Sequence, residues 1–233
     1  MIPKIIHYCW LSNDPIPTNL QRYMESWKKH LPDYEFWLWN FTRFDINSSI
    51  WVKEAFEVKK YAFAADYIRC YALYNYGGIY LDMDVEVLKS FNDLIHLPYF
   101  LCQEQHSPIE AAVMGAEKYS RLFEGMVKYY ENIHFIQKDG SFDTKILPCI
   151  MDNVIQQNFE IKRITSIEQF DTSPDKINIL PPDWFSPKSY KTGRIHLTKN
   201  TYTIHHFAGS WIPLNKRLKH ILRQILGRII QRY

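Results

Sequence analysis

Cysteine is scarce in this sequence, and its four residues (Cys9, Cys70, Cys102 and Cys149) lie far apart. No two of them have the close spacing of a zinc-binding pair, which excludes a cysteine-based metal site. We therefore expect reduced thiols in a cytosolic protein, with a disulfide as the alternative that the sequence leaves open.

Long apolar runs are also absent. No stretch approaches the roughly 20 apolar residues that a membrane-spanning helix needs, and residues 1–10 run straight into a polar segment, unlike a signal peptide. Internal repeats, low-complexity tracts and linkers are missing too. A chain of 233 residues, 46% of them hydrophobic and 23% charged, fits one globular α/β domain over residues 1–212.

Acidic residues are missing from the last part of the chain. The net charge is +3, but residues 212–233 hold six basic residues and no acid: Lys216, Arg217, Lys219, Arg223, Arg228 and Arg232. Leucine and isoleucine recur there at helical spacing from Leu218 to Ile230. We expect a basic amphipathic helix over residues 213–233 that contacts an anionic membrane surface through residues 214–233. The alternative is a terminal helix packed on the domain, and no nucleic-acid partner is expected because no other basic patch occurs.

Strand-like and helix-like patterns alternate through the rest of the chain. Apolar or alternating stretches predict strands over residues 2–9, 34–39, 79–82, 84–88, 98–103, 160–164, 177–180 and 201–206. Helical periodicity predicts helices over residues 17–30, 49–59, 61–76, 118–131 and 143–157. This alternation predicts an α/β sheet with helices on both faces, closed by the last three strands. The loop at residues 181–194 is a candidate rim or lid.

Residues 77–84 give the strongest functional signal, Gly-Gly-Ile-Tyr-Leu-Asp-Met-Asp. An Asp-x-Asp triplet is common by chance, but here it follows a predicted helix, two glycines and a short apolar strand. Asp82 and Asp84 can face the same site because side chains at i and i+2 of a strand point the same way. Two adjacent carboxylates repel each other unless a cation lies between them. Oxygen ligands favour Mn²⁺ or Mg²⁺ over zinc, and such a metal would hold a phosphate-bearing substrate.

Asp66 and Arg69 lie three residues apart in the helix predicted over residues 61–76, so they share a helix face. From spacing alone, the simpler interpretation is a surface ion pair, which would contribute little to stability.

Three blocks of sequence resemble the family 32 glycosyltransferases. The first is Ile-Pro-Lys-Ile-Ile-His-Tyr-Cys-Trp at the start of the chain. The second runs from Ala-Ala-Asp-Tyr-Ile-Arg to Leu-Tyr-Asn-Tyr-Gly-Gly-Ile-Tyr-Leu-Asp-Met-Asp, and is similar to a block in the catalytic domains of large clostridial glucosylating toxins. The third is His-His-Phe-Ala-Gly-Ser-Trp at residues 205–211. The resemblance implies a GT-A-like (Rossmann-like) single domain with a mixed central sheet, which transfers a hexose from a nucleotide sugar with retention.

The resemblance also implies a set of metal ligands. Asp84 matches the direct ligand, and Asp82 would contact the ribose, or the metal through water. His206 matches the histidine of the closing motif and is the expected second ligand. His205 is the alternative, because neighbouring residues of a strand point to opposite faces. Either histidine could instead be purely structural.

Further site residues follow from the same resemblance. Asp66 and Arg69 match positions that bind the donor sugar's hydroxyls, and with Asp82 and Asp84 they form the expected catalytic group. Trp10 matches a tryptophan that stacks on uracil, although it could be a core aromatic. The diphosphate would contact Gly209, Ser210 and Trp211, where a small residue permits close approach and two side chains donate hydrogen bonds. No nucleophile stands out: Glu104 and Asp143 follow predicted elements but could be ordinary surface acids.

The expected donor is UDP-galactose, UDP-glucose or UDP-GlcNAc, with GDP-mannose as the alternative. With a basic tail, a lipid-linked oligosaccharide is the expected acceptor, in capsule or O-antigen assembly at the cytoplasmic face of a bacterial inner membrane. Two other classes stay open. A metal-dependent phosphoester hydrolase often needs two metals and more acidic ligands than the sequence offers. A non-catalytic sugar-binding module would bind glycan without metal.

Overall fold

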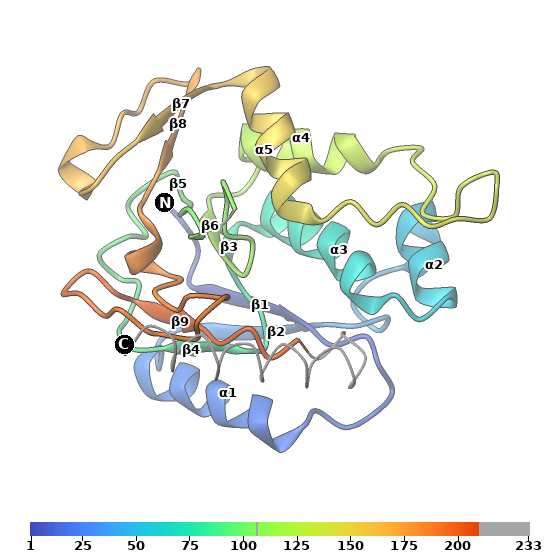
Figure 1. Ribbon diagram of the computed structural model, residues 1–233, viewed down its shortest axis with the longest axis horizontal. Helices are drawn as coiled ribbons and strands as arrows, with labels where there is room; N and C mark the ends of the chain where they lie inside the picture. Colours follow the sequence, from blue (N-terminus) through green and yellow to red (C-terminus); the bar gives the residue numbers. More distant parts are fainter. Residues whose placement is uncertain (106, 210–233) are drawn as a thin grey trace.

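A five-stranded central sheet organises the chain, as shown by a computed structural model that describes residues 1–105 and 107–209 (Figure 1). Its strand order is β2-β1-β3-β6-β5. The strands are β1 (Ile5–Cys9), β2 (Glu35–Trp39), β3 (Gly78–Leu81), β5 (Tyr99–Phe100) and β6 (Val113–Ala116). β1 pairs in parallel with β2 and β3, whereas β6 runs antiparallel to β3 and β5. The mixed central sheet expected from the sequence is thereby confirmed.

Two small sheets stand apart from the central one. β4 (Val85–Val87) pairs antiparallel with β9 (Thr203–His205), and β7 (Glu160–Arg163) pairs in parallel with β8 (Lys176–Ile179). The prediction that the last three strands close the central sheet is therefore wrong. The central sheet instead continues from β3 through β6 to the edge strand β5. The sequence did not predict β6, because Val-Met-Gly-Ala is short and shows no alternation.

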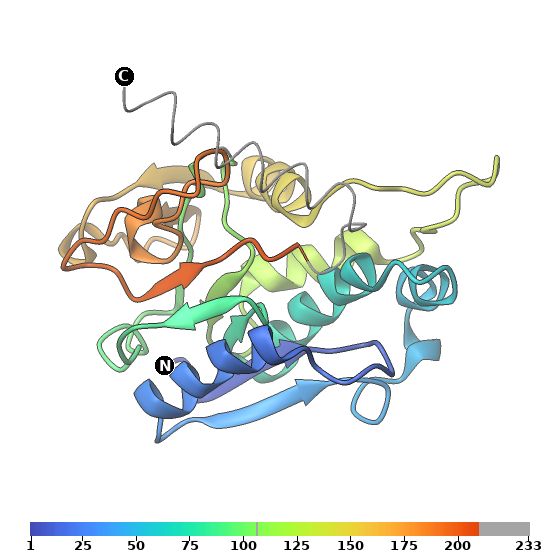
Figure 2. The same ribbon diagram turned by 60° about the horizontal axis from the view of Figure 1, so that its bottom comes forward.

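Helices cover both faces of the central sheet, as expected (Figures 1 and 2). Helix α1 (Thr18–His30) packs on one face, and the cluster on the other face includes residues of the remaining helices. These are α2 (Ile50–Glu57), α3 (Tyr61–Tyr76), α4 (Arg121–Tyr130) and α5 (Leu147–Asn158). Short 3₁₀ turns occur at Ile46–Ser48, Ile167–Gln169 and Pro182–Trp184. The helix expected over residues 213–233 lies outside the described residues.

The described part of the chain bears on two expectations, the lack of a membrane-spanning helix and the state of the cysteines. Within residues 1–105 and 107–209, no helix has the length and apolarity to cross a bilayer. All four cysteines are free; three are buried and Cys149 is exposed.

Two glycines turn the chain from α3 into β3. Gly77 has φ +65° and Gly78 has φ +102°, a region that L side chains rarely adopt. A Cβ at Gly77 would lie 2.6 Å from the backbone nitrogen of Lys118, so space as well as conformation requires glycine there. The turn ends α3 and starts β3 within one residue, which places Asp82 at the carboxyl end of β3.

A buried histidine ties this turn to the first two strands. The indole Nε1 of Trp39 donates to Nδ1 of His7 at 3.0 Å, so the ring proton must sit on Nε2. That Nε2 then donates to the carbonyl oxygen of Gly77 at 2.6 Å. Burial lowers the pKa of His7 to about 4. The neutral ring is therefore part of the folded structure.

Acid is expected to weaken this arrangement. Between pH 6.5 and 4 the unfolded chain protonates His7, whereas the folded chain does not. The free energy of unfolding therefore falls as the pH falls over this range, by at most about 3 kcal/mol for this group. The destabilisation caused by His7→Gln should therefore be smaller at pH 4.5 than at pH 7.5 in urea unfolding. His96→Gln, at an exposed position, serves as the control. A His7→Gln effect that stays constant across this pH range would contradict the assignment.

Candidate metal and donor-binding site

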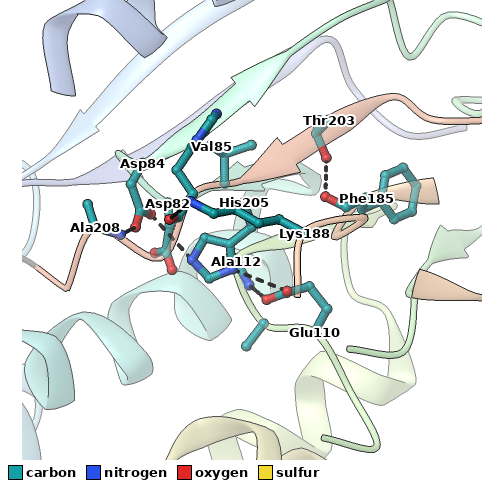
Figure 3. A network of polar contacts seen from close by, with 12 residues as sticks. Asp82, Asp84, Val85, Glu110, Ala112, Phe185, Lys188, Thr203, His205 and Ala208 are labelled. Atoms are coloured by element: carbon teal, nitrogen blue, oxygen red, sulfur yellow. Dashed lines mark hydrogen bonds and ion pairs between the residues drawn. The ribbon is translucent and has the colours of Figure 1, made fainter. Parts of the chain in front are cut away.

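Asp82, Asp84 and His205 form one compact cluster (Figure 3). One ligand atom from each lies within 4.8 Å of the other two. His205 Nε2 is 3.5 Å from Asp84 Oδ1. The two aspartates follow β3, at the carboxyl end of a strand in the central sheet, where α/β proteins bind ligands.

The pairing of β4 with β9 brings the histidine to the aspartates. His205 lies opposite Val85, the residue after Asp84. The backbone N–H of His206 donates to the Asp84 carbonyl at 3.0 Å. The backbone N–H of Ala208 donates to Asp84 Oδ2 at 2.7 Å. Residues 205–208 thus lie along Asp84, and the Ala208 N–H holds its carboxylate in place.

His206 faces away from this cluster. Its Nε2 is 2.8 Å from Glu86 Oε2, and its ring stacks on Tyr23 at 4.4 Å between centroids. His205, rather than the His206 expected from the resemblance, therefore lies beside the aspartates, because neighbouring residues of a strand point to opposite faces. Which of the two histidines binds the metal stays a prediction. The role of His205 as a ligand is itself a proposal.

Glu110 holds the other side of His205, and the sequence reading missed it. Its side chain is buried; Oε2 is 3.2 Å from His205 Nδ1, and Oε1 accepts the backbone N–H of Ala112 at 2.8 Å. The available signal was an acid placed directly before the apolar stretch that becomes β6. Metal-binding histidines commonly pair their second nitrogen with such a carboxylate.

Asp84, His205 and Glu110 favour one another's charged forms, whereas Asp82 and Asp84 oppose each other. Burial alone would raise the pKa of Asp84, but His205 and the Ala208 N–H hold it at about 2. Burial would likewise lower the pKa of His205, yet Glu110 and Asp84 hold it well above its ordinary value. Burial raises the pKa of Asp82, against the opposing effect of Arg69 and with the help of Asp84.

Arg69 and Asp66 belong to this site through Asp82. Arg69 is buried, and its guanidinium lies 3.3 Å from Asp66 Oδ1 and 3.2 Å from Asp82 Oδ1. It also donates to the carbonyl of Ala111 at 2.9 Å and lies over the Tyr80 ring. Burial raises the pKa of Asp66 to about 7, against the effect of Arg69. The surface ion pair that spacing alone favoured is wrong, because both side chains are inside.

A divalent cation fits this set of side chains. The ion pairs connect four carboxylates, those of Asp66, Asp82, Asp84 and Glu110, to Arg69 and His205. Where all four carboxylates are ionised, negative groups exceed positive ones at this largely buried position. Two carboxylates and one imidazole are ligands that suit Mn²⁺ or Mg²⁺.

The remaining expected site residues are Trp10, the Gly209–Trp211 segment, Glu104 and Asp143. Trp10 follows β1, whose parallel pairing with β3 puts Trp10 and Asp82 at the same edge of the sheet. Its Nε1 donates to the Asp14 carbonyl at 2.7 Å. Gly209 has φ +58° and ends the described chain, so Ser210 and Trp211 lie outside the described residues. Glu104 and Asp143 are not among the clustered ligands.

Comparison with known families points to sugar transfer. Residues 17–101 match the sequence model of the family described as "Glycosyltransferase sugar-binding region containing DXD motif". The matched segment holds Asp66, Arg69, Asp82 and Asp84, but not His205 or Glu110. His205, the third member of the cluster, and its partner Glu110 thus come from later in the chain.

Several curated proteins are similar to this chain. Inositol phosphoceramide mannosyltransferase 3 of Schizosaccharomyces pombe is 32% identical over 142 residues, covering 58% of this chain and 40% of that protein. Mannosyl phosphorylinositol ceramide synthase SUR1 of Saccharomyces cerevisiae is 30% identical over 143 residues, covering 58% and 37%. An uncharacterized glycosyltransferase of Acanthamoeba polyphaga mimivirus is 35% identical over 149 residues, covering 60% and 59%. The chain therefore spans less than two thirds of each of these relatives.

A solved structure shares the fold. The protein described as "PaToxG Glycosyltransferase" gives a TM-score of 0.50 at 17% identity, covering 67% of this chain and 68% of that one. This similarity concerns the fold alone. With the family match and the named mannosyltransferases, the comparisons support a glycosyltransferase with the α/β fold expected from the sequence.

Proposed function

We propose that this protein is a metal-dependent retaining glycosyltransferase that moves a hexose from a nucleoside-diphosphate sugar to a lipid-bearing acceptor. The observation that carries the proposal is the cluster of Asp82, Asp84 and His205 at the carboxyl end of β3, connected to Arg69. The retaining outcome rests on the family resemblance.

In the proposed reaction the cation stabilises charge, and groups of the protein hold its ligands in place. A divalent cation, when bound by Asp82, Asp84 and His205, would stabilise the negative charge that develops on the leaving diphosphate. Arg69 fixes the Asp82 carboxylate, and the Ala208 N–H fixes that of Asp84. Preorganised ligands of this kind lower the reorganisation that the reaction requires.

Donor recognition is assigned to the side chains around the cluster. Asp66 and Arg69 would bind the sugar hydroxyls, since Asp66 accepts hydrogen bonds and Arg69 donates them. Trp10 would stack on the base, at the same edge of the sheet. Gly209, Ser210 and Trp211 would bind the diphosphate.

Two classes of sugar donor are candidates. The named activities of the fungal relatives are mannosyl transfers to inositol phosphoceramide, which favour mannose and a lipid-bearing acceptor. The UDP-hexose expected from the sequence stays as the alternative, as does a place in capsule or O-antigen assembly. Contact of residues 214–233 with the cytoplasmic face of a membrane also stays a prediction, because that segment lies outside the described residues.

A thermal-shift panel tests the donor site. The purified protein is heated with GDP, GDP-mannose, UDP, UDP-glucose, UDP-galactose or UDP-GlcNAc, each with Mn²⁺ or with EDTA. A ligand that binds the folded state raises the melting temperature by mass action. We expect a rise with one nucleotide class that needs Mn²⁺. A panel without any rise, on folded protein, would contradict the donor assignment and favour a hydrolase or a sugar-binding module.

Replacing Glu110 with Gln is expected to weaken metal binding. The amide cannot supply the negative charge that orients the His205 ring, and losing such a partner lowers metal affinity about 10- to 100-fold. Mn²⁺ affinity is measured by isothermal titration calorimetry. Glu86→Gln is the matched control, since Glu86 holds His206 in the same way. A larger loss in Glu86→Gln than in Glu110→Gln would instead make His206 the ligand.

A further inference from the structure

A basic hairpin precedes β9, in the orange segment of Figure 1. We use this name for residues 188–199, where a bridge pairs Lys188 with Ile195 and Ser189 N–H donates to the Arg194 carbonyl. Residues 184–209 contain no acid, whereas the hairpin holds four cations: Lys188, Lys191, Arg194 and Lys199. Among the described residues, no ion pair involves Lys191, Arg194 or Lys199. The hairpin therefore carries net positive charge, and three of its four cations form no ion pair within that part of the chain.

The same hairpin exposes apolar side chains. Tyr190, Ile195 and Leu197 are 39%, 45% and 55% exposed, which makes three large exposed hydrophobic residues within eight positions. All residues from 194 to 197 are exposed. Single exposed hydrophobic residues need no explanation, but a group of them marks an interaction surface.

The hairpin lies against the strand end that carries His205. Lys188 Nζ donates to the His206 carbonyl at 2.7 Å. The Tyr190 ring meets the Phe207 ring edge-on at 5.3 Å, and Phe207 in turn lies 4.1 Å from the His205 ring. A surface that received the hairpin would therefore lie next to the Asp82, Asp84 and His205 cluster.

We propose that the basic hairpin docks on an anionic lipid bilayer, with Lys191, Arg194 and Lys199 at the headgroups and Tyr190, Ile195 and Leu197 at the interface. Basic residues next to a membrane are attracted by its negative surface potential. Tyrosine is enriched at membrane–water interfaces, and exposed aliphatic side chains gain by leaving water there. Lysine, by contrast, is depleted in protein–protein interfaces, which disfavours a protein partner. Nucleic acid would not use the aliphatic side chains.

This contact goes beyond the proposed function and is independent of residues 214–233. It requires neither metal nor donor. Its consequence is that the sheet edge with the candidate site would face lipid headgroups, so that an acceptor could be taken from the bilayer without leaving it.

Vesicle co-sedimentation of the full chain tests the proposal in EDTA, without nucleotide. Phosphatidylcholine vesicles are used with and without phosphatidylserine. The triple variant Lys191→Gln/Arg194→Gln/Lys199→Gln is expected to bind the anionic vesicles about tenfold or more weakly than the wild type. Ile195→Ser/Leu197→Ser is expected to bind several-fold more weakly. Phe142→Ser/Ile146→Ser, which alters two other exposed hydrophobic residues, should bind like the wild type.

Three results would overturn the proposal. The first is wild-type protein that does not bind anionic vesicles. The second is hairpin variants that circular dichroism shows to be folded and that bind these vesicles as well as the Phe142→Ser/Ile146→Ser control. The third result combines two measurements on the Ile195→Ser/Leu197→Ser variant. If it binds vesicles like the wild type but loses a dimer that the wild type forms, as measured by light scattering, the surface belongs to a contact with a second copy of the chain. None of these results concerns nucleotide binding, so the proposed function would stand or fall separately in the thermal-shift panel.

Discussion

Replacing Asp84 with Asn is expected to lower sugar transfer about a thousandfold, since a metal ion contributes several kcal/mol of charge stabilisation in the transition state. Asp84 is held from two sides: it contacts His205 and accepts the Ala208 N–H. Asn keeps the shape of the side chain but removes the charge that would attract the cation. Initial rates with radiolabelled donor, in Mn²⁺, measure the effect.

Two controls make the Asp84 result specific. Asp139→Asn changes an exposed acid on another loop and should leave the rate within twofold or so of the wild type, as surface substitutions usually do. His205→Asn should cost far more activity than His206→Asn, because only His205 lies in the cluster. An Asp84→Asn protein that transfers sugar at the wild-type rate in Mn²⁺, and equally in EDTA, would contradict the metal site.

Replacing Arg69 with Met is expected to destabilise the fold by about 3–5 kcal/mol, the usual cost of removing one partner from a buried ion pair. Arg69 is buried and pairs with both Asp66 and Asp82, so the substitution would leave two carboxylates without their counter-charge. It also removes the donor to the Ala111 carbonyl. Chemical denaturation at pH 8 in EDTA measures the loss in free energy of unfolding.

A second substitution separates charge from packing at this position. Burial raises the pKa of Asp66 to about 7, so ionising this carboxyl is unfavourable in the folded chain. The free energy of unfolding therefore falls as the pH rises from the pKa of Asp66 in the unfolded chain to its pKa of about 7 in the folded chain. Asp66→Asn should therefore be neutral or stabilising at pH 8 and should recover part of the Arg69→Met loss. Lys128→Met, which breaks the exposed pair with Glu124, is the matched control and should cost under about 1 kcal/mol. An Arg69→Met cost as small as that would contradict the buried network.

Local patterns predicted the local elements well. The helix expected over residues 61–76 has the same bounds as α3, because a long apolar stripe and two glycines define both its length and its end. Asp82 and Asp84 do share one site, as expected, although they lie in the turn between β3 and β4 and not on one face of a strand. Their burial could not be predicted, since it depends on helices and strands that pack from elsewhere in the chain.

Long-range pairing decided what sequence patterns left open. Whether His205 or His206 faces the aspartates depends on the register of β9 against β4, and a shift of one residue would exchange them. Glu110 reaches His205 across 95 positions, and its place before an apolar stretch does not say which residue it contacts. Gly115 explains the missed β6: a Cβ there would lie 2.3 Å from the Phe100 ring, so this strand needs a glycine that weakens any strand pattern.

The most direct test of the metal site is anomalous diffraction from crystals grown with Mn²⁺ and either GDP or UDP. We expect one manganese peak bounded by Asp82, Asp84 and His205, with the nucleotide's diphosphate next to it. A peak between His206 and Glu86, or a bound nucleotide without manganese at the Asp82, Asp84 and His205 cluster, would contradict it.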